Sequence, residues 1–329
     1  MIGMTKIFLV AIFSILIGNT LSGEIVRADQ TIEKSFTVSK GGTLFLRTDL
    51  GAISVITAPG NSVNVKVIHK FSGWDEEDEK EFMKNFDIEF SQTPDDVNVT
   101  ARLKEDWSRK RENLQIEFEI AVPSRYNVDL KTAGGSISVD DLEGSVDAET
   151  SGGSLKFGDI SGPVTGVTSG GSIVLKGSKG DADLKTSGGS ITLGMVNGNV
   201  DARTSGGSIT IDEAQGNVYA KTSGGSINVD EVLGTIEATT SGGSVNVNLS
   251  RQPAENCRLE TSGGSISVYM AENIAVDIDA KTTSGRVESD FEIKGERGDD
   301  NGWVKGSVNG GGQKLYLRTS GGNIYIYKK

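Results

Sequence analysis

The sequence predicts an all-β protein: a single-stranded parallel β-solenoid (β-helix) with 18-residue coils and a short N-terminal capping helix. Three observations predict it. A motif recurs every 18 residues, apolar and polar residues alternate between its copies, and glycine makes up 44 of the 329 residues, well above the usual ~7%. The pattern does not assign the handedness of the coil.

The repeated motif is Thr-(Ser/Ala)-Gly-Gly-Ser. Its regular copies, each 18 residues after the last, begin at Thr132, Thr150, Thr168, Thr186, Thr204, Thr222 and Thr240. Further copies begin at Thr261 and Thr319, a degenerate copy begins at Thr282, and residues 48–55 resemble a worn copy. A fixed period of this kind is typical of stacked repeats, in which each unit needs its neighbours for stability.

Each unit is predicted to contain two short strands with one buried face. In residues 200–217, Val200, Ala202 and Thr204 alternate with Asp201 and Arg203 before a glycine pair. Alternation with a period of two indicates strands, and we expect the glycines to adopt positive φ angles at the bend. Because the pattern never reverses, equivalent residues should stack in parallel register. The threonine column would then be buried, with its hydroxyls bonded to neighbouring backbone or to each other.

Residues 1–28 are predicted to be a signal peptide, since a basic start precedes an apolar run at residues 7–17 that is too short to span a membrane. Cleavage after Ser22 and cleavage after Ala28 both fit the small-residue rule. We therefore expect an extracytoplasmic protein (periplasmic, secreted or at the cell surface) without a transmembrane anchor after signal removal. Cys257, the one cysteine, would be unpaired and buried.

The segments beside the regular repeats are predicted to close the ends of the stack, where open strand edges need protection. Residues 29–127 would supply N-terminal strands and the helical cap, with Ser72 capping a helix whose apolar side includes Trp74, Phe82, Met83 and Phe86. Residues 128–288 would form the regular solenoid. Residues 289–329 would supply a loop around residues 297–302 and a C-terminal closing coil.

Three stretches resemble a known bacterial family. They are Val122-Pro-Ser-Arg-Tyr-Asn-Val-Asp-Leu-Lys-Thr leading into Gly-Gly-Ser-Ile, Leu142-Glu-Gly-Ser-Val, and the ending that runs from Val308-Asn-Gly-Gly-Gly to Leu315-Tyr-Leu-Arg-Thr-Ser-Gly-Gly-Asn-Ile. Residues 40–327 are similar to the "putative adhesin" domain of unknown function, whose members are exported β-solenoids. The resemblance implies this fold and, through the family name, adhesion. It brings no catalytic residues.

Composition argues against most enzyme classes. One histidine and one cysteine leave no basis for a histidine-based triad or a multi-cysteine metal site, so we predict a non-enzymatic protein with no catalytic, cofactor-binding or metal-ligating residues. The net charge of −12 disfavours binding to nucleic acid. His69 is interpreted as a satisfied structural residue. The loop that holds Asp299 and Asp300 lacks the spacing of an EF-hand, and cation binding there stays open.

Two surface columns remain as candidates. Asp129, Asp147, Asp183 and Asp201 point outward, and Lys131, Glu149, Lys185 and Arg203 follow them two residues on. Because three of these four followers are basic, mutual neutralisation is favoured over a metal or catalytic array.

The second candidate is a polar face, with hydroxyl columns ~7 Å apart along the strand and ~4.8 Å apart between coils. Its proposed members are Ser190, Thr192, Ser208, Thr210, Ser226 and Asn228. This spacing could match a regular ligand such as a glycan or ice. Alternatively, small polar residues merely fit a tight bend, and Lys156 and Val174 interrupt the second column.

Together these features predict an exported adhesion, surface-binding or envelope-scaffold module whose partners are glycans or envelope and surface proteins. The alternatives are a carbohydrate-active β-helix enzyme and a glycan- or ice-surface binder that uses the Ser/Thr/Asn columns. If the polar face binds nothing, partner proteins at the helix-capped end or at the tyrosine-bearing end (Tyr316, Tyr325, Tyr327) become the better hypothesis.

Overall fold

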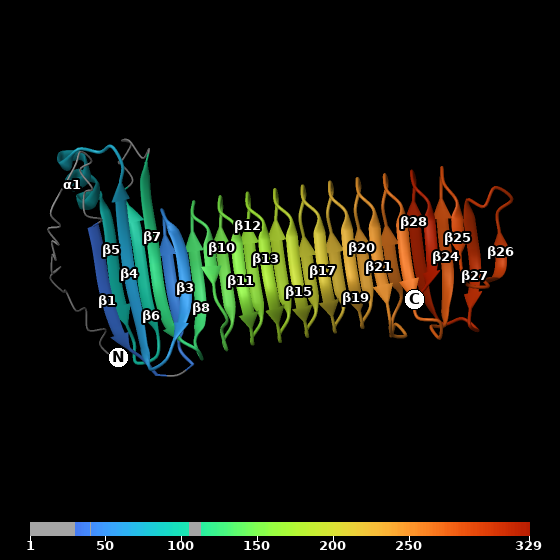
Figure 1. The fold of residues 1–329 in the computed structure, drawn as a ribbon, viewed down its shortest axis with the longest axis horizontal. Coiled ribbons are helices and arrows are strands. Elements are labelled where there is room, and N and C mark those ends of the chain that lie inside the picture. The colour runs from blue at the N-terminus through green and yellow to red at the C-terminus, as the bar shows by residue number, and fades with distance from the viewer. Residues whose placement is uncertain (1–29, 40, 105–112) are drawn as a thin grey trace, which may run out of the picture.

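The computed structural model describes residues 30–39, 41–104 and 113–329, which form two long facing sheets in an elongated stack (Figure 1). These residues are all-β apart from one helix, α1 (Glu76–Asn85). The all-β, parallel architecture predicted from the repeat is thus confirmed. The predicted signal peptide lies outside the described residues. Within them, no helix has the length and apolar character that crossing a membrane requires.

Sheet A contains 14 strands. Their spatial order is β1 (Gln30–Thr37), β4 (Ser62–Phe71), β7 (Leu114–Pro123), β3 (Ala52–Ala58), β9 (Ile137–Val139), β11 (Leu155–Ile160), β13 (Ile173–Ser178), β15 (Ile191–Val196), β17 (Ile209–Ala214), β19 (Ile227–Val232), β21 (Val245–Leu249), β23 (Ile266–Met270), β29 (Ile324–Lys328) and β25 (Val287–Ser289).

Sheet B contains 15 strands. Their spatial order is β26 (Lys294–Arg297), β27 (Trp303–Val308), β24 (Val276–Thr282), β28 (Gln313–Thr319), β22 (Cys257–Glu260), β20 (Ile236–Thr239), β18 (Val218–Lys221), β16 (Val200–Arg203), β14 (Ala182–Thr186), β12 (Val164–Thr168), β10 (Val146–Thr150), β8 (Asn127–Thr132), β2 (Thr43–Thr48), β6 (Val97–Leu103) and β5 (Phe86–Gln92).

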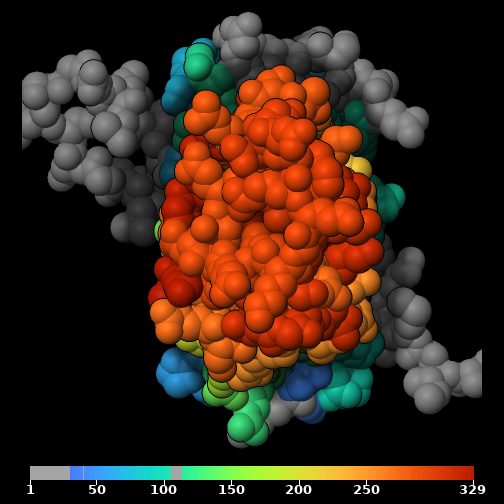
Figure 2. Space-filling view, turned by 90° about the vertical axis from the view of Figure 1, so that its right-hand side faces the viewer, coloured from blue at the N-terminus to red at the C-terminus, as the bar shows by residue number. Residues whose placement is uncertain are grey.

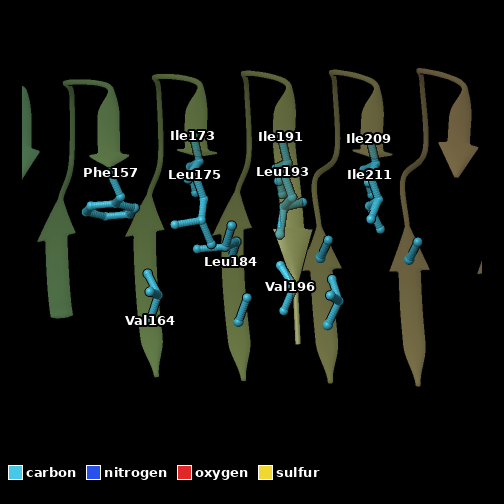
Figure 3. Close-up of a cluster of buried hydrophobic side chains, with 14 of the residues drawn as sticks. Phe157, Val164, Ile173, Leu175, Leu184, Ile191, Leu193, Val196, Ile209 and Ile211 are labelled. Carbon is cyan, nitrogen blue, oxygen red and sulfur yellow. The ribbon is translucent and has the colours of Figure 1, made fainter. Parts of the chain in front are cut away.

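The central strands alternate between the two sheets and pair in parallel with residues 18 positions away. Val146 pairs with Val164 in sheet B, and Ile173 pairs with Ile191 in sheet A. Their apolar side chains fill the space between the sheets as stacked layers (Figure 3). Residues 48–55 join this register through β2 and β3, so the worn copy is part of the stack.

The threonine of each copy links two neighbouring turns. The hydroxyl of Thr150 donates to the carbonyl oxygen of Gly135 at 2.8 Å and accepts the amide of Gly153 at 3.4 Å. The same pair of contacts recurs from Thr168 to Thr222. These threonines are buried, which confirms the predicted structural column.

The expected positive φ angles at the glycine pairs are wrong, because none of the glycines in the repeat pairs has a positive φ. The glycines are required instead by the close approach of consecutive turns. A Cβ added to Gly171 would lie 2.2 Å from the carbonyl oxygen of Gly153, and one on Gly207 would lie 2.2 Å from that of Gly189. Any side chain at this position would push the coils apart.

Antiparallel strands complete the N-terminal end, where β1 pairs with β4, β4 with β7, and β5 with β6. Helix α1 lies at this end (Figure 1). Its N-cap is Asp75, whose carboxylate accepts the amide of Asp78 at 2.8 Å, and not the expected Ser72. Trp74, Phe82 and Phe86 are buried, as the predicted apolar side required.

The C-terminal end differs from the expected closing coil. Strand β28 lies between β22 and β24, and β29 lies between β23 and β25, so the last strands of the sequence are inserted into the stack, as the position of the C-terminus in Figure 1 shows. The expected loop around residues 297–302 is the tip of an antiparallel hairpin, β26–β27. In the end-on view, orange-red residues of this region form a continuous surface (Figure 2).

Candidate functional site

The outward face of sheet A carries a polar row that crosses the strands. Thr192, Thr210 and Asn228 are direct cross-strand neighbours on β15, β17 and β19. The register continues to Asn246 on β21 and Ser267 on β23. We call these five residues the polar row. Their side chains are exposed or half-buried, whereas the residues before and after each of them point into the core.

The serine column beside the polar row has a structural contact. The Oγ atoms of Ser190 and Ser208 accept the backbone amides of Ser208 and Ser226 at 3.2 and 3.1 Å, and Ser226 does the same for Ser244. Each serine therefore holds the turn of the next coil. This contact agrees with the interpretation that small polar residues fit the bends, while ligand binding by this column stays a prediction.

Amide groups extend the pattern toward the C-terminal end. Asn246 Nδ2 donates to Asn228 Oδ1 at 2.8 Å, and Asn248 Nδ2 donates to the carbonyl of Asp230 at 2.7 Å. A carboxamide has two donor hydrogens and an oxygen with two lone pairs. These contacts fix the orientation of the amides and leave them capacity for further hydrogen bonds.

Three tyrosines lie at the end of the polar row. Tyr269 on β23 stacks on Tyr327 on β29 with ring centroids 5.0 Å apart, and Tyr325 stacks on Tyr327 at 5.6 Å. The hydroxyl of Tyr325 accepts a hydrogen bond from Asn323 Nδ2 at 2.7 Å. We call Tyr269, Tyr325 and Tyr327 the tyrosine patch. The sequence pointed to two of them, but Tyr269 was missed because it joins them only through the inserted strand β29.

Tyr316, which was grouped with Tyr325 and Tyr327, lies on β28 in sheet B instead. Its ring is covered by the guanidinium groups of Arg258 and Arg318, at 4.4 and 3.8 Å from the centroid. On the same sheet, Arg203 lies 4.7 Å from the centroid of Tyr219. Cation–π contacts thus occupy the tyrosines of sheet B.

The aspartate column on sheet B is mostly neutralised by neighbouring cations. Asp183 pairs with Lys185 at 2.9 Å and Asp201 with Arg203 at 2.6 Å, as the sequence predicted. Asp129 differs, since its partner at 2.5 Å is Arg47.

The fourth aspartate of the column, Asp147, lies opposite Asp129 on the neighbouring strand. Lys131 pairs with Glu149 at 2.8 Å. Partial burial and the neighbouring Asp129 raise the pKa of Asp147. No group of three or more potential metal ligands occurs in the described residues.

An open hollow of about 470 Å³ lies over the start of the sheet B strands β14, β16, β18, β20 and β22, and its lining includes Asp181, Asn199 and Asn217. These side chains already hold the stack together. The Oδ1 atoms of Asp181 and Asn199 accept the backbone amides of Asn199 and Asn217 at 2.7 and 2.9 Å. Side-chain oxygens at this edge of sheet B thus accept backbone amides from the next coil, as the serine oxygens do beside sheet A.

Two residues with reactive side chains are buried away from these faces. His69 is enclosed by Phe71 and Phe86, and its Nδ1 lies 3.3 Å from the carbonyl of Gln30. Its Nε2 finds no hydrogen-bond partner in the described residues, so the expectation of a fully satisfied histidine is wrong for this atom. Burial lowers the pKa of His69 and raises that of the Cys257 thiol. Cys257 is buried, as predicted.

Comparison with known proteins gives one family and several solved structures. The family model described as Toastrack DUF4097 matches residues 55–327. A "putative adhesin" from Bacteroides fragilis is 12% identical, with 90% of this chain and 97% of that chain covered and a TM-score of 0.36. A "putative adhesin" from Parabacteroides distasonis is 10% identical, with coverage of 90% and 97% and a TM-score of 0.38. A "putative lipid binding protein" from the same organism is 12% identical, with coverage of 91% and 96% and a TM-score of 0.36. No curated protein matches the chain.

Proposed function

The chain belongs to the Toastrack DUF4097 family, as the resemblance in its motifs indicated, and on that premise we propose that it is an extracytoplasmic, non-enzymatic module for adhesion, surface binding or envelope scaffolding. One observation carries the proposal. The outward face of sheet A repeats polar side chains in register from strand to strand, so that identical contacts can add along an extended partner.

The building unit of this scaffold is one 18-residue coil of a single-stranded solenoid, with one strand in each sheet. The pairing of residues 18 positions apart supports this assignment. Deleting residues 168–185 as a unit should preserve register and folding, whereas deleting nine residues should exchange inward and outward faces. Circular dichroism and thermal melting compare the two deletions. If the two deletion variants have the same spectra and melting temperatures, the 18-residue coil is not the repeating unit.

The chain is divided into a signal peptide (1–28), an N-terminal cap (29–127), the regular solenoid (128–288) and a C-terminal segment (289–329). The apolar run at residues 7–17 supports export. The intact mass of the exported protein should correspond to a start after Ser22 or after Ala28. Recovery of an unprocessed chain in the cytoplasm would contradict the extracytoplasmic location.

The binding face comprises Ser190, Thr192, Ser208, Thr210, Ser226 and Asn228, with the exposed or half-buried threonines and asparagine making the outward contacts. Because many weak contacts act together, a single Thr210→Ala change should barely reduce binding. Replacing Thr192 and Thr210 by arginine should abolish binding to cell-envelope fragments from the producing cells.

A matched control places the same substitutions on the other sheet. Thr165 and Thr239 point outward from β12 and β20, so Thr165→Arg with Thr239→Arg adds the same charge and bulk to sheet B. The control should bind envelope fragments like the unchanged protein, and both variants should keep its melting temperature. Equal binding by the two variants would remove the sheet A face from the proposal.

The competing function is a carbohydrate-active enzyme. Among the surface columns of the described residues, only the carboxylates on sheet B are candidate catalytic groups. Incubation with a broad panel of polysaccharides, read by reducing ends and unsaturated products, separates the two functions. We expect no cleavage. Turnover that disappears in an Asp183→Asn, Asp201→Asn variant would replace the binding module with an enzyme.

A further inference from the structure

The tyrosine patch is assembled from segments far apart in the sequence. Strand β29 pairs with β23, which sets Tyr325 opposite Ser267 and Tyr327 opposite Tyr269. The rings of Tyr269 and Tyr325 both stack on Tyr327. Tyr269 keeps 38% of its surface exposed. The insertion of β29 thus builds a continuous aromatic surface at one end of the polar row.

These rings differ from the tyrosines of sheet B in what covers them. Arginine guanidinium groups lie over Tyr219 and Tyr316. In the described residues, the rings of the tyrosine patch stack on one another. The patch keeps aromatic surface in contact with solvent, because Tyr269 is exposed and Tyr325 and Tyr327 are half-buried, whereas arginine already covers Tyr219 and Tyr316.

Uncharged hydrogen-bonding groups lie beside the rings. Asn248 is the cross-strand neighbour of Tyr269, and Asn246 is the neighbour of Ser267, which in turn lies opposite Tyr325. A hydroxyl and two amides therefore lie within one or two strand spacings of the rings. Aromatic rings surrounded by a few fixed polar groups are typical of sites that bind amphipathic small molecules.

Charges of both signs lie near the patch, since Lys328 directly follows Tyr327 and Arg286 directly precedes β25. Glu288 lies opposite Tyr325 on β25, and Asp290 follows β25 directly. The pKa of Tyr327 is raised by burial first, then by Tyr269 and Tyr325, and then by these two carboxylates. The charges around the patch are thus mixed and select neither an anionic nor a cationic ligand, so a neutral ligand fits the patch best.

We infer that the tyrosine patch, together with Asn246, Asn248 and Ser267, forms a subsite for a neutral polysaccharide of equatorially linked hexopyranoses. The flat C–H face of such a sugar packs on the tyrosine rings, and its equatorial hydroxyls reach the amides and the serine. The inference rests on the proposed function, since it names the class of ligand for one end of the same face.

The test is calorimetric titration of the full chain with two neutral sugars, cellohexaose and hexa-N-acetylchitohexaose, with an oligogalacturonate as the anionic probe and a chitosan hexamer as the cationic one. At least one neutral hexamer should bind. Tyr269→Ala with Tyr327→Ala should weaken binding about tenfold or more, since two stacking contacts are lost. The matched control, Tyr219→Ala with Tyr316→Ala, should bind within about twofold of the unchanged protein.

Two further measurements keep the inference testable if the alanine variant does not fold. Tyr269→Phe with Tyr327→Phe keeps the rings and should retain binding. In the unchanged protein, a neutral hexamer should shift the ring signals of the three patch tyrosines in the NMR spectrum while those of Tyr219 and Tyr316 stay in place.

The failures of the two proposals are distinguishable. Absence of binding to both neutral hexamers, binding of only a charged probe, or undiminished binding by the alanine variant would overturn the subsite and leave the scaffold function standing. The opposite outcome is also recognisable. If neutral hexamers bind the patch but the Thr192→Arg, Thr210→Arg variant still binds envelope fragments, the subsite is supported and the proposed binding face is contradicted.

Discussion

In the first repeat turn, adding one methyl group to the second glycine should be far more damaging than adding it to the first. A Cβ on Gly135 would lie 2.0 Å from the carbonyl oxygen of Gly51, while a Cβ on Gly134 meets no atom within 4 Å. Neither glycine has a positive φ, so alanine is compatible with both backbone conformations. The two variants therefore differ only in the space that the neighbouring coil leaves.

Relieving the overlap at Gly135 requires the two turns to separate by at least about 1 Å, since Cβ atoms essentially never approach another heavy atom more closely than about 3 Å. Two contacts between the coils would suffer: the hydrogen bond from the Thr132 hydroxyl to the Gly51 oxygen, at 2.8 Å, and the ladder bond from the Ile53 amide to the Ser136 oxygen, at 2.9 Å. At about 1 kcal/mol each, plus the strain of displacement, Gly135→Ala should cost about 2–4 kcal/mol.

The assay is urea unfolding of both variants followed by circular dichroism, with hydrogen exchange to locate the change. Gly134→Ala should be neutral or stabilise the protein by up to about 1 kcal/mol, because alanine restricts the unfolded chain. Faster exchange in Gly135→Ala should be confined to the coils around residues 51 and 135. Equal stability of the two variants would refute the claim that close approach of the turns selects glycine.

Three further predictions concern buried polar groups. Thr186→Val removes the donor to the Gly171 oxygen at 2.7 Å and should lower the free energy of unfolding in urea by about 1–2 kcal/mol, whereas Thr186→Ser should restore most of it. Because burial lowers the pKa of His69 below its ordinary 6.5, the unfolded chain binds the proton more tightly. The melting temperature should therefore fall as the pH drops from 6.5 toward that lowered pKa, and His69→Leu should lose this part of the pH dependence. Burial also raises the pKa of Cys257, so a thiol reagent at pH 8 should label the native protein slowly and the unfolded protein at once; rapid native labelling would contradict the burial.

The regular part of the fold was predictable because one local rule repeats. Once Val146 and Val164 occupy equivalent positions 18 residues apart, the alternation fixes which face each neighbour presents and the register follows. The buried threonines followed from the same parity. The reason for the glycine pairs did not, because close approach between coils is a contact across the stack that the sequence of one coil does not reveal.

The ends were less predictable for different physical reasons. Strand β1 has no fully buried residue, and β26 (Lys294–Arg297) is exposed throughout, so neither has the apolar alternation that marks a strand. The order of the last strands depends on which exposed edge of the stack accepts them, and neighbouring edges are chemically alike. The tyrosine patch could not be predicted from the sequence for the same reason, since Tyr269 and Tyr327 become neighbours only through that strand order.

The insertion of β28 and β29 has a consequence for biogenesis. Strands β24 and β25 precede them in the chain, yet among the described strands they are joined to the earlier coil only through β28 and β29. While residues 313–328 are still being synthesised, β24 can pair with β27, but neither β24 nor β25 is joined to the earlier coil, and the edges of β22 and β23 stay open. The last coil is thus held in the stack by strands that are synthesised after it. This final assembly step pairs residues far apart in the sequence, so it is expected to be slow and prone to mispairing. Chains cut short before residue 313 would carry an unfinished, aggregation-prone edge, so proteolytic surveillance can tell a completed molecule from a truncated one.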